Sequence, residues 1–76
     1  MAGITAKLEA VYVPKSDKDE PKSKQIRANS QVDALRLAQR LCPRGYYLSD
    51  IYSAKGYIVW SKGPGWLKGT QELFRR

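Results

Sequence analysis

Apolar and polar residues alternate at the beginning of the chain. From residue 4 to residue 12 every second side chain is apolar, so that one face collects Ile4, Ala6, Leu8, Ala10 and Tyr12. This spacing predicts a strand that is buried on one face. We expect the strand to end at Pro14, because proline has no amide hydrogen to donate to the sheet. A shorter alternation over residues 25–28 predicts a second strand, and hence a hairpin.

The segment between these two strands is polar. Residues 16–24 include no apolar side chain apart from one proline. Because such a segment has nothing to bury, we expect a mobile loop at residues 15–24. The acidic residues Asp17, Asp19 and Glu20 lack the spacing of a calcium loop, and neighbouring lysines balance their charge, so we expect no metal site here.

The next segment has the period of an amphipathic helix. Ser30 can cap its amino end, and Asp33 is placed to reach back to the backbone before the helix. At about 100° per residue, one face collects the apolar side chains Ala34, Leu35, Ala38, Leu41 and Cys42, with Leu37 at its flank. Pro43 disfavours helical geometry in the residue before it, so this helix of about three turns should stop near Leu41.

Two runs rich in tyrosine, isoleucine and valine follow, at residues 46–53 and 57–62. They predict a second hairpin, in which Gly56 supplies the positive φ that a short turn needs. The order β-β-α-β-β predicts an α+β fold: a single domain over residues 1–76, with one helix packed on one face of an antiparallel sheet. A strand order of 2-1-3-4 satisfies short connections and a right-handed crossover. We expect residues 63–76 to form a C-terminal tail.

The second hairpin carries more apolar residues than one helix can cover. With a two-residue turn at residues 54–55, Tyr52 would face Tyr57 across the hairpin. Asp50 would be costly to bury unpaired, so we expect its face to be the open one. That face would carry Tyr46, Leu48, Asp50, Tyr52, Tyr57 and Val59. The face under the helix would carry Tyr47, Ser49, Ile51, Ile58 and Trp60.

An open sheet face with three tyrosines requires a partner or a cover. One alternative is a platform on which unpaired bases stack, with Arg44, Lys55 and Lys62 beside it to meet phosphates. A second is a protein interface, including a homodimer formed through the open sheet face. In a third, the tail folds back over this face and covers it with Trp66, Leu67, Leu73 and Phe74.

The formal net charge of +7 is concentrated in the second half of the chain. Residues 1–33 hold six lysines and arginines against five acidic residues, whereas residues 34–76 hold eight against only Asp50 and Glu72. A concentrated positive field attracts polyanions. Arg36 and Arg40 lie one helical turn apart, where like charges repel slightly, and bridging of successive phosphates would offset that repulsion. A solvated helix face is the other interpretation of the pair.

Catalysis and metal binding have little support in the sequence. The chain has no histidine and a single cysteine, Cys42, which falls on the apolar helix face. These counts remove the commonest acid–base group and any typical zinc site. We therefore expect a protein that is not an enzyme and uses no cofactor. The single cysteine favours a reducing, cytoplasmic location, and no run of about 18 apolar residues is present to span a membrane.

These observations predict a small basic accessory protein that binds nucleic acid. Its lysines and arginines would contact phosphates, while aromatic rings on the open sheet face and at the turn near Trp66 would contact bases. The residues that we assign to this surface are Arg36, Arg40, Arg44, Tyr46, Tyr52, Lys55, Tyr57, Lys62, Trp66 and Lys68. The alternative is a small protein-binding modulator, such as an inhibitor or adaptor of the phage or plasmid type, which would dock on an acidic protein surface through the same face.

Overall fold

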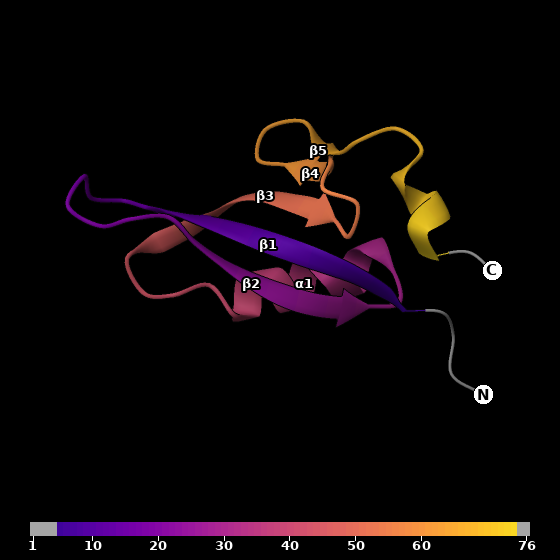
Figure 1. The fold of residues 1–76 in the computed structure, drawn as a ribbon, viewed down its shortest axis with the longest axis horizontal. Helices are drawn as coiled ribbons and strands as arrows, with labels where there is room; N and C mark the ends of the chain where they lie inside the picture. The colour runs from indigo at the N-terminus through magenta and orange to yellow at the C-terminus, as the bar shows by residue number, and fades with distance from the viewer. Residues whose placement is uncertain (1–4, 75–76) are drawn as a thin grey trace.

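The computed structural model describes residues 5–74, which form a five-stranded antiparallel sheet and one α-helix (Figure 1). The elements are β1 (Ala6–Pro14), β2 (Lys22–Ala28), α1 (Gln31–Arg40), β3 (Tyr46–Ser53), β4 (Ile58–Ser61), β5 (Gly65–Trp66) and the 3₁₀-helix η1 (Thr70–Phe74). The order across the sheet is β2-β1-β3-β4-β5. The predicted α+β fold and strand order are confirmed, with β5 as an added edge strand. Ile4 of the predicted first strand, and residues 75–76 of the tail, lie outside the described residues.

β1 belongs to the first hairpin and lies between β2 and β3, with both of which it pairs. Its side chains Leu8, Ala10 and Tyr12 are buried against α1, whereas Glu9 between them is exposed. In Figure 1 the first two strands cross in front of α1, so the helix covers one face of the sheet only. β2 begins at Lys22, earlier than the alternation indicated, because its backbone continues to pair with β1 where its side chains are all exposed.

The helix begins and ends close to the predicted residues. The Ser30 hydroxyl accepts a hydrogen bond from the Asp33 amide at 3.1 Å, and the Asp33 carboxylate accepts one from the Asn29 amide at 3.3 Å. Both bonds satisfy amides that have no partner within the helix. Leu41 departs from expectation: it is the C-cap, its φ and ψ of −89° and 2° leave the helical range, and its side chain is 39% exposed. No helix within residues 5–74 has the length and apolar character needed to cross a bilayer.

The sheet holds the carboxyl end of the helix in place. The Tyr12 hydroxyl of β1 donates a buried hydrogen bond of 2.6 Å to the Ala38 carbonyl, and the Lys24 amino group of β2 donates one of 2.9 Å to the Leu41 carbonyl. Carbonyls in the last turn of a helix lack partners within the helix. The first hairpin therefore supplies the C-terminal capping groups of α1.

The turn of the second hairpin is longer than predicted. The Ser53 amide donates to the Tyr57 carbonyl at 2.9 Å, which leaves a three-residue turn at residues 54–56. Gly56 has a φ of +95°, as the turn prediction required. Tyr52 consequently pairs with Ile58, and the predicted Tyr52–Tyr57 pairing is wrong.

Two irregularities in strand register overturn part of the predicted face assignment. One lies where β3 meets β1 at Val11 and Tyr12, and the other lies where β4 meets β3 at Ile51 and Tyr52. An extra residue at a bulge reverses the alternation beyond it. Leu48 and Val59, expected on the open face, are therefore core residues, 7% and 0% exposed, whereas Ile58, expected under the helix, is 38% exposed. Ile51 and Trp60 contact the core as predicted.

The tail packs back onto the domain. β5 pairs with β4, and the Trp66 and Phe74 rings make an edge-to-face contact with centroids 6.4 Å apart. The Gln31 side-chain amide, at the start of α1, donates to the Thr70 hydroxyl at 2.9 Å. Trp66, Leu73 and Phe74 pack against the core cluster that α1 covers. The tail thus covers core on the helix side and leaves the opposite sheet face open.

Candidate nucleic-acid interface

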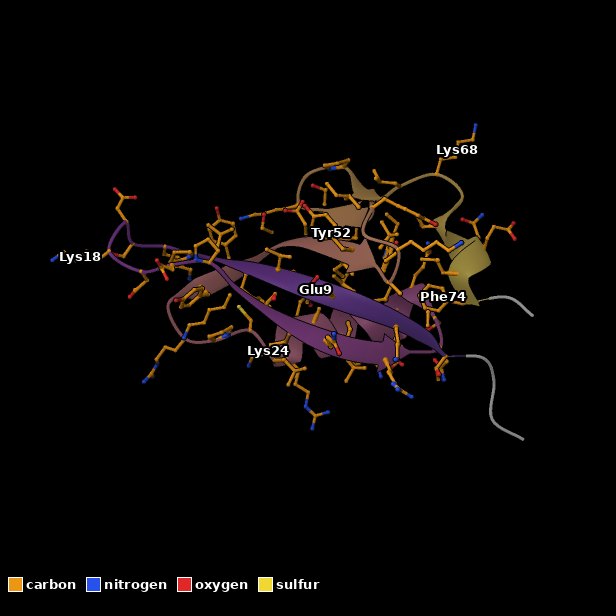
Figure 2. The ribbon with its side chains drawn as sticks, in the orientation of Figure 1. Glu9, Lys18, Lys24, Tyr52, Lys68 and Phe74 are labelled. Carbon is orange, nitrogen blue, oxygen red and sulfur yellow. The ribbon has the colours of Figure 1, made fainter. Side chains whose placement is uncertain are left out.

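The three tyrosines expected on one open face do not form a platform. Tyr46 packs against the core, and its hydroxyl donates to the Glu20 carbonyl at 3.0 Å. Tyr52 lies on the opposite face of the sheet, paired with Glu9 of β1; Figure 2 shows both side chains. Tyr57 is 55% exposed next to the hairpin turn. The predicted stacking platform is therefore wrong, because bulges and a longer turn distribute its rings to different places.

The remaining predicted residues are spread over several elements. Lys55 is exposed at the tip of the second hairpin, and Lys68 extends from the tail loop in Figure 2. Trp66, which we expected to be presented by a flexible turn, is half-buried in β5. The other four predicted residues lie along α1, after its end and after β4: Arg36, Arg40, Arg44 and Lys62.

A basic strip follows the outer face of α1. We define it by Arg36, Arg40, Arg44 and Lys24, all of which are exposed. Within residues 5–74, no hydrogen bond or ion pair engages the three guanidinium groups. Lys24 joins the strip because its amino group bonds to the Leu41 carbonyl. Sequence reasoning missed this lysine, since only the early start of β2 brings it beside the carboxyl end of α1.

One carboxylate, that of Asp33, lies beside the amino end of the basic strip, three residues before Arg36 on α1. Asp50 is the only acidic residue between positions 34 and 62. It pairs with Val11 on the sheet face opposite α1, where the hydroxyls of Ser49 and Ser61 donate to it at 2.7 and 2.8 Å. The Asp33 carboxylate, at the amino end of α1, accepts one hydrogen bond from the Asn29 amide. Asp33 therefore offsets part of the charge of Arg36, whereas the sequence from Arg36 to Arg44 holds no acidic residue.

A hollow opens between the carboxyl end of α1 and the second hairpin, with a volume of about 400 Å³. This α1–β4 hollow is lined by Gln39, Cys42, Tyr47, Leu48, Trp60 and Lys62. The Lys62 amino group lies 4.3 Å from the centroid of the Tyr47 ring, an arrangement in which a cation is attracted to the ring face. The sequence does not predict this hollow, because its lining residues come from the end of α1 and from the second hairpin, and only the tertiary structure brings these segments together.

A second hollow, of about 320 Å³, lies between the hairpin and the tail. It is lined in part by Tyr57, Ile58 and Leu67, which are among the exposed large apolar residues of the domain. Lys68 also borders it. Exposed apolar side chains that border one hollow are typical of a small protein-contact surface.

The buried Tyr12 hydroxyl has a raised pKa. Burial of its ring, and to a smaller extent the charge of Cys42, raises the pKa of Tyr12, so that its hydroxyl stays protonated and donates to Ala38. Over residues 5–74, no three His, Cys, Asp or Glu side chains are grouped so that they could hold a metal ion. Cys42 is a free thiol that donates to the Tyr46 carbonyl at 3.3 Å.

Comparison with known proteins provides no further guide to the function. The chain matches no protein-family model, no curated protein sequence and no solved structure. The geometry and charge of the domain are therefore the basis for proposing a function.

Proposed function

We propose that this protein is a non-catalytic accessory factor that binds nucleic acid through the basic strip on α1. The observation that carries the proposal is the row of three unengaged arginines, Arg36, Arg40 and Arg44, with Lys24 beside its end. Phosphate contacts of this kind hold the backbone without reading its sequence. We therefore expect weak sequence specificity.

The spacing of the strip suits a phosphate backbone. Arg36 and Arg40 are separated by about one helical turn, a rise of roughly 5–6 Å. The guanidinium group can bond a phosphate through two parallel N–H groups. Because both arginines lie on α1 and no hydrogen bond holds their side chains within residues 5–74, they are available to bridge phosphates along one strand. The proposed surface thus lies on the helix side and not on the open sheet face.

The test is fluorescence anisotropy with labelled oligonucleotides at several salt concentrations. For the wild type, affinity should fall steeply with salt because each contacted phosphate releases counterions. The double substitution Arg36→Ala, Arg40→Ala should reduce the slope of log K against log salt by about 1.4 to 1.8, since each lost phosphate contact removes roughly 0.7 to 0.9.

Lys15→Ala with Lys18→Ala is the matched control. It removes the same formal charge from the exposed loop between β1 and β2. This control should keep most of the wild-type slope. A wild-type affinity that does not depend on salt, or an equal loss of slope in the two double variants, would overturn the proposal.

A protein partner is the second candidate. The exposed apolar side chains around the second hollow, between the second hairpin and the tail, favour it. Tyr57 and Leu67 would anchor an acidic partner, with Lys68 at the rim. In that case Tyr57→Ala with Leu67→Ala should abolish a stoichiometric complex that Arg36→Ala with Arg40→Ala leaves intact. Oligonucleotides would then show no useful affinity for the wild type.

A further inference from the structure

The α1–β4 hollow lies directly beside the basic strip. We infer that it receives one unpaired base of a single-stranded nucleic acid whose phosphates the strip holds. This inference rests on the proposed function and deepens it, because it names the form of nucleic acid that the surface prefers. The lining of the hollow and the cations on its two sides favour a base as the occupant.

The lining suits a flat aromatic ring. The lining includes the half-buried aromatic residues Tyr47 and Trp60 and the buried Leu48, all from the second hairpin. Gln39 offers an amide that can donate to and accept from the edge of a base. Bases stack on aromatic side chains whatever their identity, since each base has a π face. The hollow therefore suits a base without selecting one sequence.

The cations are placed to hold the strand on both sides of that base. Gln39, on the helix wall of the hollow, follows Arg36 by three residues, a spacing at which side chains are neighbours on a helix. Arg40 comes next along the chain and is exposed. On the opposite wall, the amino group of Lys62 lies over Tyr47. A base between the two walls would thus have positive charge near its phosphates on either side.

Base pairing explains why the preferred partner is a single strand. In a duplex the bases are stacked and paired, and a base reaches a protein pocket only after it is flipped out, which opposes binding. An unpaired strand has free bases. The same strip can still contact duplex phosphates, so we expect duplex to bind more weakly and with similar salt sensitivity.

The first experiment compares three ligands of equal length in the same anisotropy assay: a single-stranded oligonucleotide, an abasic strand with the same phosphates, and a duplex. We expect the strand with bases to bind about tenfold more tightly than the abasic strand. Equal, salt-sensitive binding of all three would overturn the inference but leave the proposed function intact. Absence of binding by every ligand would overturn the proposed function itself.

The second experiment fills the hollow. Gln39 is exposed, so Gln39→Phe can place a ring in the space without disturbing the core. The variant should lose the difference between normal and abasic strands while it binds the abasic strand as the wild type does. Gln25→Phe is the matched control, because Gln25 is exposed on the sheet face opposite α1 and should keep that difference. If Gln39→Phe keeps the full difference, the base does not enter the hollow.

Cys42 gives an independent readout because it lines the hollow and is the only cysteine in the chain. A bound base should slow alkylation of its thiol, whereas a saturating abasic strand should not. Equal protection by the two strands would contradict the inference, and so would the absence of protection by a saturating strand that carries bases. An acidic peptide that protects Cys42 better than the oligonucleotide would instead assign the hollow to a protein side chain.

Discussion

Tyr12 shows how one residue can join two layers of a small domain. Its ring is fully buried in the core, and its hydroxyl reaches across to the Ala38 carbonyl in the last turn of α1. Alternation along β1 was enough to predict that the ring points inward. The partner of the hydroxyl was not predictable, since it depends on where the helix end comes to rest over the sheet.

Removal of this hydroxyl should weaken the fold. We expect Tyr12→Phe to lower the free energy of unfolding by about 1–2 kcal/mol, because it leaves a buried helix carbonyl without a partner. Denaturant unfolding followed by circular dichroism measures this loss. The control is Tyr57→Phe at an exposed site, which should change stability by less than about 0.5 kcal/mol. Equal losses in the two variants would show that the buried bond contributes nothing specific.

The stability that the Tyr12 hydroxyl contributes through its hydrogen bond should depend on pH. Burial raises the pKa of Tyr12 above its ordinary value of 10.0, so the folded state favours the protonated form. A raised pKa in the folded state contributes stability that is complete below pH 10.0 and is lost as the pH rises through the folded value. The stability difference between wild type and Tyr12→Phe should therefore be constant from neutral pH to about pH 9 and should shrink above pH 10.

Among the elements, the second hairpin differs most from its predicted form. Its three-residue turn and the register shift beside Ile51 decide which side chains reach the core. Period-two alternation assumes an unbroken ladder, and one extra residue reverses it. For this reason Val59 is buried and Ile58 is exposed, which is the reverse of the prediction, although both lie in the predicted strand.

A pair of neighbouring substitutions tests this face assignment. Val59→Ala should lower the free energy of unfolding by about 1.5–3 kcal/mol, because Val59 is fully buried. Ile58→Ala removes more atoms but from a partly exposed side chain, so we expect a loss of about 1 kcal/mol or less. Denaturant titration of both variants distinguishes the two arrangements. A larger loss for Ile58→Ala than for Val59→Ala would instead support the face assignment predicted from regular alternation.

At the scale of the whole molecule, net positive charge is concentrated on the helix side of the sheet. The basic strip lies there with Asp33 at one end, whereas on the opposite face Lys7 and Arg27 are balanced by Glu9 and Asp50. With a formal net charge of +7, the free domain experiences repulsion among its own cations. A polyanion would relieve that repulsion on binding, which is consistent with the proposed function.

Salt should therefore act in opposite directions on the free and bound protein. Raising the salt concentration from about 50 to about 200 mM should weaken oligonucleotide binding, because the release of the same counterions into a more concentrated solution is less favourable. The same change should raise the Tm of the free protein by about 2–4 °C, because it screens self-repulsion worth roughly 0.5 kcal/mol. Thermal unfolding without ligand measures the second effect. A Tm that falls with salt would mean that attractive charge pairs dominate the free fold.

The sequence by itself determined the elements and their order. Local alternation and the capping residue Ser30 were sufficient for β1 and α1, since propensity and periodicity act over a few neighbouring residues. The excess of basic residues after position 33 was equally visible in the chain. These properties need no information about which segments meet.

Only the tertiary structure decided which side chains share a surface. Bulges separated the three tyrosines, and the early start of β2 brought Lys24 to the end of α1. The α1–β4 hollow likewise joins residues from the helix end and from two strands. Such groupings depend on register and on contacts between distant segments, where a shift of one residue moves a side chain to the other face. The predicted fold was confirmed because it depends on local sequence patterns. The proposed binding site moved from the open sheet face to the helix side because it depends on strand register.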